Sequence, residues 1–206
     1  GPAFRAIAQE GKIVQSRSYM DQCMQAGMEV FGPDVVLPKC ENICKDAVEL
    51  LSAEECPTEK MDLVLHSDQM LLQIHESIGH ALEVDRILGD ERNYAGWSFV
   101  NLEDFGKLKY GSDIMNITFD PTIPKEFASY GFDDSGLKAT KEFIIKNGTL
   151  LRGLGGLESQ ERSNIQGVAN FRACSWNRAP IDRMANLNLE PGTSSFDDII
   201  SSVERG

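Results

Sequence analysis

The residues best suited to chemistry are two of the chain's three histidines, which lie in one six-residue stretch. His75 is followed directly by Glu76, and His80 comes five residues after the first histidine. Zinc hydrolases use these residue types: two neutral imidazoles hold the metal, and the neighbouring carboxylate takes a proton from the attacking water. The pattern favours a metal site. The alternative is that both histidines are ordinary core or surface residues that match the motif by chance.

The spacing of the two histidines places a demand on the helix that carries them. In the usual zinc motif the histidines are four residues apart and lie one above the other on one face. An interval of five turns the two side chains roughly 140° apart on a regular α-helix. Both imidazoles can reach one ion only if the helix is overwound or bulged. We expect such a distortion at Gly79, which precedes His80, and a single π-turn would supply it.

The helix that must position both histidines is predicted over residues 69–88, with Gly89 as its C-terminal stop. The first sixty residues read as mostly helical, and a short apolar run then predicts a strand. The predicted elements of this part are helices over residues 21–31 and 38–53 and a strand over residues 61–65.

Beyond residue 95 the pattern changes to short strands. Residues 113–119 alternate polar and apolar side chains, and residues 142–151 predict a hairpin. Its turn is Asn147-Gly148, which fits a type I′ turn because both central positions need a positive φ. Residues 154–171 are predicted to form a loop, and residues 196–203 a closing helix with Ser194 or Ser195 as N-cap. Helices followed by short antiparallel strands predict an α+β fold.

Composition excludes several classes of protein. The chain has 20 Lys and Arg against 32 Asp and Glu, a net charge of −12, which argues against direct nucleic-acid binding. No apolar run is long enough to span a membrane. Five cysteines argue against a disulfide framework, and Cys40 and Cys44 fit buried free thiols on a helix better than a metal or redox pair. Free thiols and the lack of a signal peptide predict a cytoplasmic protein.

The histidine stretch resembles the metal motif of the TldD/PmbA peptidase family, in its TldD-type, metal-bearing members. The resemblance starts from H-E-x-x-x-H followed by A-L-E-x-D and extends, in the same order, over about residues 10–206. The other similar segments are Phe119-Asp120-Pro121-Thr122, Phe132-Asp133-Asp134-Ser135-Gly136, the hairpin over residues 142–151, Arg172, Pro180, Arg183-Met184, Asn186, Glu190-Pro191-Gly192 and residues 197–203.

The resemblance implies a zinc peptidase that hydrolyses short or unstructured peptides, as a homodimer or as a heterodimer with a related subunit. By this resemblance, His75 and His80 are zinc ligands, and Glu76 is the general base and acid. Glu83 and Asp85 match further acidic positions, and we expect them to orient the imidazoles without touching the metal. The alternative for these two is the solvated face of the helix.

The chain also departs from the family pattern. The family's third ligand is a cysteine that would lie beyond Gly206, and Cys174 occupies a position where the family has no ligand. We therefore expect residues 3–206 to be an incomplete central and C-terminal part of the catalytic domain, inactive by itself, with Gly1-Pro2 left from removal of a tag. The rival reading is a non-catalytic partner or peptide-binding subunit; a hydrolase of small amides is a further one.

A peptide substrate is expected to bind as an added strand at a sheet edge, because this mode reads main chain rather than sequence. The hairpin centred on Asn147-Gly148 is the candidate edge. Arg183 and Asn186 either contact substrate or have structural roles.

Overall fold

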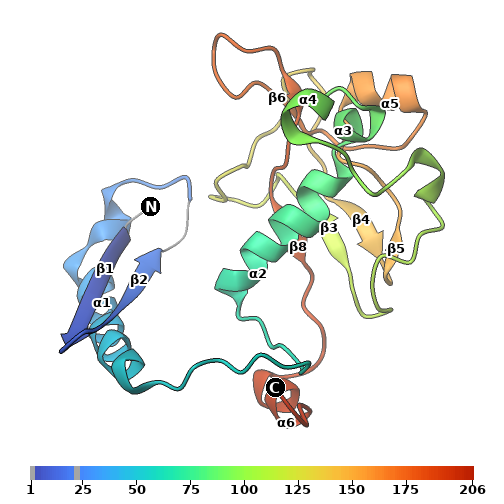
Figure 1. Ribbon diagram of the computed structural model, residues 1–206. Coiled ribbons are helices and arrows are strands. Elements are labelled where there is room, and N and C mark those ends of the chain that lie inside the picture. The colour runs from blue at the N-terminus through green and yellow to red at the C-terminus, as the bar shows by residue number, and fades with distance from the viewer. Residues whose placement is uncertain (1–2, 21–23) are drawn as a thin grey trace. The chain divides into compact units, whose positions relative to one another are not determined.

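The computed structural model describes residues 3–20 and 24–206, in which helices and antiparallel sheets are mixed (Figure 1). The predicted α+β fold class is confirmed. These residues separate into two compact units. The first comprises the chain up to Lys60 together with Lys125–Phe127, and the second comprises Met61–Pro124 and Ala128–Gly206. The proposed tag residues, Gly1 and Pro2, and Cys23 lie outside the described residues.

The first unit is a β-hairpin packed on one long helix. Strands β1 (Ala3–Glu10) and β2 (Ile13–Met20) pair antiparallel through a turn in which Gly11 has a φ of 58°. Helix α1 (Pro33–Glu49) contacts both strands. The prediction that the first sixty residues are mostly helical is therefore wrong. The inward positions of β1 include Ala6 and Ala8, small residues of high helix propensity whose alternation is a weak strand signal.

The described part of the predicted helix over residues 21–31 holds only a short 3-10 turn, η1 (Met28–Phe31). Helix α1 starts at Pro33, a residue well suited to the first helical position, and continues through Pro38 where the sequence predicted a start. A 3-10 turn, η2 (Leu50–Ser52), follows it. The two cysteines of α1 are free, as expected. The expectation that they are buried is wrong, since Cys40 is half-buried and Cys44 is exposed.

The second unit is built on a four-stranded antiparallel sheet of order β5-β4-β3-β8. The turn between β4 and β5 has φ of 48° at Asn147 and 71° at Gly148, so the predicted hairpin and its turn are confirmed. The strand predicted over residues 61–65 is absent, because these described residues have no ladder partner. The sheet strands are β3 (Ile117–Phe119), β4 (Glu142–Lys146), β5 (Thr149–Leu150) and β8 (Leu187–Leu189), and a separate pair is formed by β6 (Phe171–Arg172) and β7 (Ile181–Asp182).

The residues predicted as one helix over 69–88 form a broken helix, here called the motif segment (residues 67–88). Gly89 ends it in the left-handed conformation, with a φ of 96°, as predicted. The region predicted as a loop over residues 154–171 contains a helix, α5, and the closing helix α6 is capped by Ser195 as predicted. The helices of this unit are α2 (Ser67–Ile74), α3 (Val84–Leu88), α4 (Arg92–Ala95), α5 (Leu157–Ser163) and α6 (Phe196–Ser201), with a 3-10 turn η5 (Leu102–Asp104).

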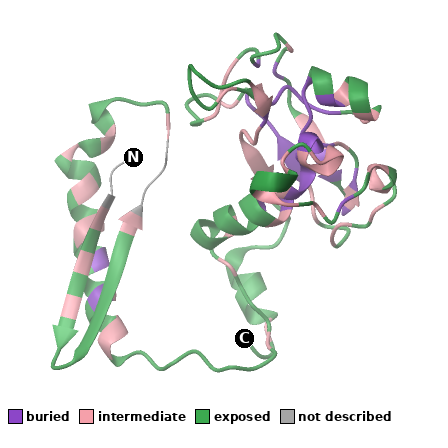
Figure 2. Ribbon diagram, turned by 45° about the horizontal axis from the view of Figure 1, so that its top comes forward, coloured by how far each residue is buried: buried purple, intermediate pink, exposed green. Residues whose placement is uncertain are grey.

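The hydrophobic core lies between the motif segment and the sheet of the second unit (Figure 2). Ile74, Ile78 and Leu82 of the motif segment pack against Ile117 and Phe119 of β3. This packing fixes one face of the motif segment, while His75 and Glu76 stay exposed. None of the helices in the described residues is long and apolar enough to cross a membrane.

Candidate metal centre

The motif segment changes its helical winding at the two histidines. Helix α2 ends at Ile74, residues His75–Gly79 form a π-helical turn (η3), and His80–Leu82 form a 3-10 turn (η4). The backbone N–H of His80 donates to the carbonyl of His75, which is the five-residue hydrogen bond of a π-turn. The distortion expected from the five-residue interval is present, at the expected glycine.

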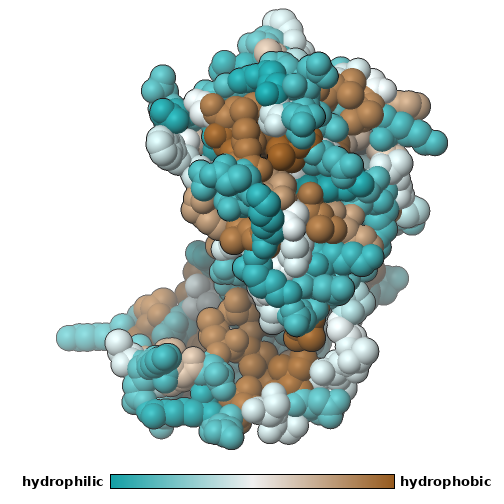
Figure 3. All heavy atoms as spheres, turned by 90° about the vertical axis from the view of Figure 1, so that its right-hand side faces the viewer, coloured by the Kyte–Doolittle hydropathy of each residue, from teal (hydrophilic) through white to brown (hydrophobic). Residues whose placement is uncertain are grey.

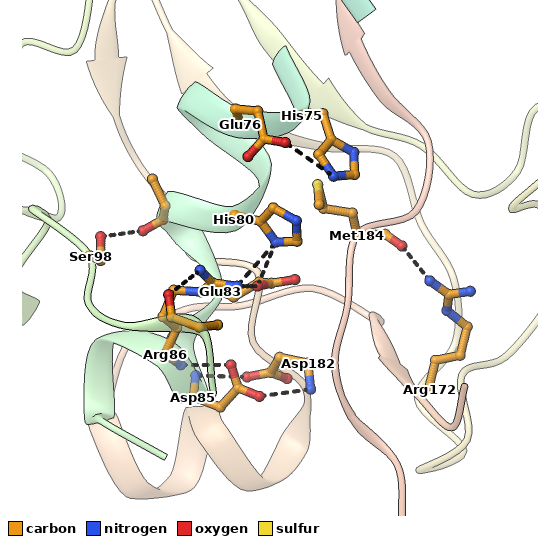
Figure 4. Close-up of polar contacts among 12 residues, drawn as sticks. His75, Glu76, His80, Glu83, Asp85, Arg86, Ser98, Arg172, Asp182 and Met184 are labelled. Carbon is orange, nitrogen blue, oxygen red and sulfur yellow. Dashed lines mark hydrogen bonds and ion pairs between the residues drawn. The ribbon is translucent and has the colours of Figure 1, made fainter. Parts of the chain in front are cut away.

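The π-turn brings the two imidazoles together. The ring centroids of His75 and His80 are 4.6 Å apart and the rings are nearly perpendicular, at 89° (Figure 4). Glu76 Oε1 lies 4.0 Å from His75 Nε2. Half of the His75 side chain and over half of the Glu76 side chain are exposed, whereas His80 is mostly covered. Two ring nitrogens and one carboxylate therefore meet at a surface that a substrate can reach.

His80 is held from behind by a buried ion pair. Its Nδ1 lies 3.0 Å from Glu83 Oε2 and 3.2 Å from Arg86 Nη2, and Arg86 Nη2 lies 3.0 Å from the same carboxylate oxygen. Arg86 can only donate and Glu83 only accept, so Glu83 Oε2 accepts from both neighbours when His80 donates its Nδ1–H to it. This tautomer leaves the lone pair of His80 on Nε2, where a metal would bind it.

Asp85 was expected to orient an imidazole, but its partner is Asp182. Its carboxylate accepts from the backbone N–H of Arg86 at 2.6 Å and of Asp182 at 3.2 Å, and the Asp182 carboxylate accepts in turn from the backbone N–H of Asp85 at 3.1 Å. Asp182 also accepts from Gly156 N–H and from the hydroxyl of Ser159. This reciprocal pair joins α3 to β7 and α5.

Burial sets the protonation of this carboxyl pair. It raises the pKa of Asp85 to about 7, and the neighbouring charges of Asp182 and Glu83 add to the effect. Burial also raises the pKa of Asp182. Glu83 and Asp85 are 1% and 6% exposed, so the alternative that they form a solvated helix face is wrong.

The remaining candidates have structural surroundings. The Asn186 amide donates to the Asp120 carbonyl and to the Ser129 hydroxyl, and its oxygen accepts from Ala128 N–H. Arg183 donates its backbone N–H to the Asn170 carbonyl. Asn186 therefore ties loops together and has no hydrogen bond to the histidines. Cys174 is a free, exposed thiol.

The hairpin proposed as a substrate edge is already covered. Tyr110 and Gly111 donate their backbone N–H groups to the Gly148 carbonyl, and Leu150 donates to Leu108. The prediction that this edge is open is wrong, because the segment over residues 106–111 pairs with it. The other edge strand of the sheet is β8, which begins three residues after Met184.

Sequence reasoning missed two residues that support the site, Arg86 and Asp182. Arg86 lies three residues after Glu83, the spacing at which a glutamate and an arginine pair on a helix, and this signal was available. Asp182 lies 97 residues from Asp85, and no local pattern connects the two.

The donor set fits zinc in part. Two imidazoles, one with its far nitrogen occupied by a carboxylate, are ligands that zinc favours. Within the described ranges, 3–20 and 24–206, no group of three or more His, Cys, Asp or Glu side chains is placed to hold an ion. The described residues thus bring two imidazoles together, fewer than the three protein ligands of a typical catalytic zinc site.

Comparison with known proteins identifies relatives of the whole chain. A model of the PmbA/TldA metallopeptidase C-terminal domain matches residues 58–206. A metalloprotease from Methanothermobacter thermautotrophicus is 35% identical over 205 residues, 98% of this chain and 42% of that protein. A metalloprotease from Methanocaldococcus jannaschii is 32% identical over 160 residues, 78% of this chain and 34% of that protein.

Among solved structures, a proposed modulator of a DNA gyrase from Thermotoga maritima matches with a TM-score of 0.69 and 21% identity. The match covers 96% of this chain and 41% of that protein, and at this identity it shows a common fold alone. The chain thus spans between 34% and 42% of the length of these relatives.

Proposed function

Because the chain belongs to the PmbA/TldD metallopeptidase family, we propose that it supplies the catalytic helix of a zinc-dependent peptidase that hydrolyses short or unstructured peptides. The observation that carries this proposal is the π-turn, which brings the rings of His75 and His80 to 4.6 Å with Glu76 exposed beside them. Without the π-turn, the five-residue interval would point the imidazoles apart.

In this proposal His75 and His80 hold the metal, and Glu83 orients His80 through its Nδ1. Zinc, when bound, would polarise the scissile carbonyl and acidify the attacking water. Glu76 accepts the proton of that water and then delivers it to the leaving amine. Its exposed carboxylate fits this task, because the group must meet both water and substrate.

A peptide would bind as an added strand along β8. This strand lies at the edge of the sheet and follows directly on the segment of Met184, which packs beside the motif segment. Backbone pairing along an edge accepts many sequences, which fits an enzyme for unstructured peptides.

Two ligands bind zinc more weakly than three, so the 206-residue chain by itself is proposed to be inactive and to depend on a further ligand.

We propose a two-subunit assembly for the active protein, either of identical or of related chains. Hydrophobic side chains lie exposed among hydrophilic ones on the face drawn in Figure 3. Leu71 and Leu72 are 70% and 61% exposed on α2, just before the π-turn, and such neighbouring apolar residues favour a protein contact. The free cysteines fit a reducing compartment such as the cytoplasm.

The test compares Glu76→Gln with an exposed control, Glu161→Gln, in the longer protein that contains this chain. Zinc content and cleavage of a short unstructured peptide are measured with and without a chelator. We expect Glu76→Gln to retain zinc and lose hydrolysis, and Glu161→Gln to retain both. Retained turnover by Glu76→Gln would refute the role of this carboxylate.

The rival function, a non-catalytic peptide-binding or partner subunit, predicts a different result. In that case neither wild type nor control cleaves the peptide, and the chelator changes nothing. Peptide binding without cleavage by the zinc-loaded wild type would favour the rival.

A further inference from the structure

The strand segment Asp182–Met184 is fastened to the motif segment at two points. At one end, Asp182 and Asp85 exchange backbone hydrogen bonds through their carboxylates. At the other, the Met184 side chain lies against Gly79, inside the π-turn (Figure 4). These two contacts flank His80 in the sequence, one before it and one after it.

The contact at Gly79 is too close for any larger residue. A Cβ added to Gly79 would lie 2.8 Å from Met184 Cγ and would overlap its sulfur. Gly79 has φ of −53° and ψ of −69°, which any residue adopts, so its backbone conformation does not require glycine. The three nearest atoms that such a Cβ would meet all belong to Met184.

Met184 is itself held in place. Its carbonyl accepts from Arg172 Nη2 at 3.0 Å, and Arg172 belongs to β6, which pairs with β7 just before Met184. Its side chain is partly buried against the core that includes Ile74 and Ile78. The thioether is thus a fixed surface against which the π-turn is packed.

From these contacts we infer that Met184 is a positioning residue, whose packing on Gly79 holds the π-turn and thereby keeps the imidazoles of His75 and His80 on one side. A regular α-helical turn would move Gly79 relative to the thioether and separate the rings. The role assigned to Met184 is exerted through the turn, and it includes no part in the chemical step. The inference rests on the proposed function for its metal readout, but not for the turn itself.

The test uses the variants Gly79→Ala, Met184→Ala and their combination, first without metal. Hydrogen exchange is measured at the His80 amide, which makes the five-residue bond, and at the Ile145 amide in β4, which reports global opening. Relative to Ile145, we expect Gly79→Ala to speed exchange at His80 at least about tenfold, because overpacking is costly in a fixed site. In the Met184→Ala background, adding Gly79→Ala should speed exchange at His80 by less than about threefold, because the overlapping atoms are gone.

Zinc affinity, measured by chelator competition in the longer protein, should fall in Gly79→Ala and also in Met184→Ala, because each change disturbs the packing that holds the turn. Adding Gly79→Ala to Met184→Ala should weaken zinc binding little further. Gly111 and Met115 offer a matched control, since a Cβ at Gly111 would also overlap a methionine sulfur. Gly111→Ala should leave the exchange of His80, relative to Ile145, unchanged.

An equal effect of Gly79→Ala in both backgrounds, no effect in the wild type, or the same His80 response to Gly111→Ala would each overturn the inference. If the exchange results follow the expectation but no variant, wild type included, binds zinc, the positioning role stands and the proposed function fails.

Discussion

One oxygen of the Glu83 carboxylate meets two donors, because both His80 Nδ1 and Arg86 Nη2 lie 3.0 Å from Oε2. Its other oxygen, Oε1, is buried and without a hydrogen-bond partner among the described residues. A charge buried in this way is stable only while its cationic partner is present. Arg86 therefore holds the Glu83 carboxylate in place, and Glu83 in turn fixes His80.

We predict that Arg86→Gln lowers the free energy of unfolding by about 3 kcal/mol, the usual cost of leaving a buried charge unpaired. Glu83→Gln combined with Arg86→Gln should cost less than the sum of the two single changes, because no buried charge remains. Chemical denaturation of the four proteins measures both effects. Arg178→Gln, at an exposed position, should change stability by less than about 0.5 kcal/mol. Strict additivity would contradict the coupling.

At this scale the sequence was informative about residue types and less so about neighbours. The interval between His75 and His80 predicted the distorted turn, because the interval is a local property of the sequence. It could not predict that Asp85 would meet Asp182 instead of an imidazole, since that contact depends on how β7 packs on α3.

The pair Asp85–Asp182 makes the junction of α3 and β7 sensitive to pH. The pKa of Asp85 is raised to about 7 in the folded protein, against about 4 in the unfolded chain. Between these values the folded state binds more protons than the unfolded state. The free energy of unfolding must therefore fall as pH rises through this window and level off above pH 7.

We predict that the metal-free protein is less stable at pH 8 than at pH 5, and that Asp85→Asn reduces this difference by about 1 kcal/mol or more. A remainder is expected because burial also raises the pKa of Asp182. Urea denaturation at several pH values measures the slope, and exposed Asp197→Asn serves as the control. An unchanged slope in Asp85→Asn would show that another group titrates.

In the turn between β4 and β5, Gly148 is required for two reasons: its backbone conformation and the closeness of other backbone atoms. Gly148 has φ of 71°, and a Cβ there would lie 2.5 Å from the Ser112 carbonyl oxygen and overlap that of Gly111. Gly136 has φ of 86° with nothing near it. Gly136→Ala should cost about 1 kcal/mol of stability through its conformation. Gly148→Ala should cost at least about twice as much, because backbone atoms must also move. Equal losses in thermal or chemical unfolding would contradict the packing of the 106–111 segment on this turn.

Elements with strong local signals were predicted correctly, and those with weak signals were not. Asn147-Gly148 and the cap at Ser195 require particular residues, so the hairpin and α6 followed from them. The hairpin of β1 and β2 was missed because two inward residues of β1, Ala6 and Ala8, are small and favour helix. Helix α5 was missed because its sequence, LESQERS, is polar, and burial of Ser159 beside Asp182 is a tertiary contact.

At the scale of the whole chain, the two units have separate interiors. Ala47, 1% exposed on α1, and Ile43 are buried within the first unit, whereas the core beside the motif segment belongs entirely to the second. The described residues that join them, 53–60, are exposed and have no regular structure apart from a bend. Lys125–Phe127 belong to the first unit, in which the Gln25 N–H donates to the Lys125 carbonyl.

We predict that the units lose structure separately. Ala47→Asp buries an unpaired charge in the first unit, a change expected to cost more than about 4 kcal/mol there. Hydrogen exchange should then become fast over Pro33–Glu49 and remain slow at Ile145 and at the His80 amide, because the core packed on the motif segment is made of residues of the second unit. The exposed control Glu41→Gln should leave both regions protected. Loss of protection at His80 in Ala47→Asp would mean that the first unit is needed to hold the π-turn, and the metal site would then depend on both units.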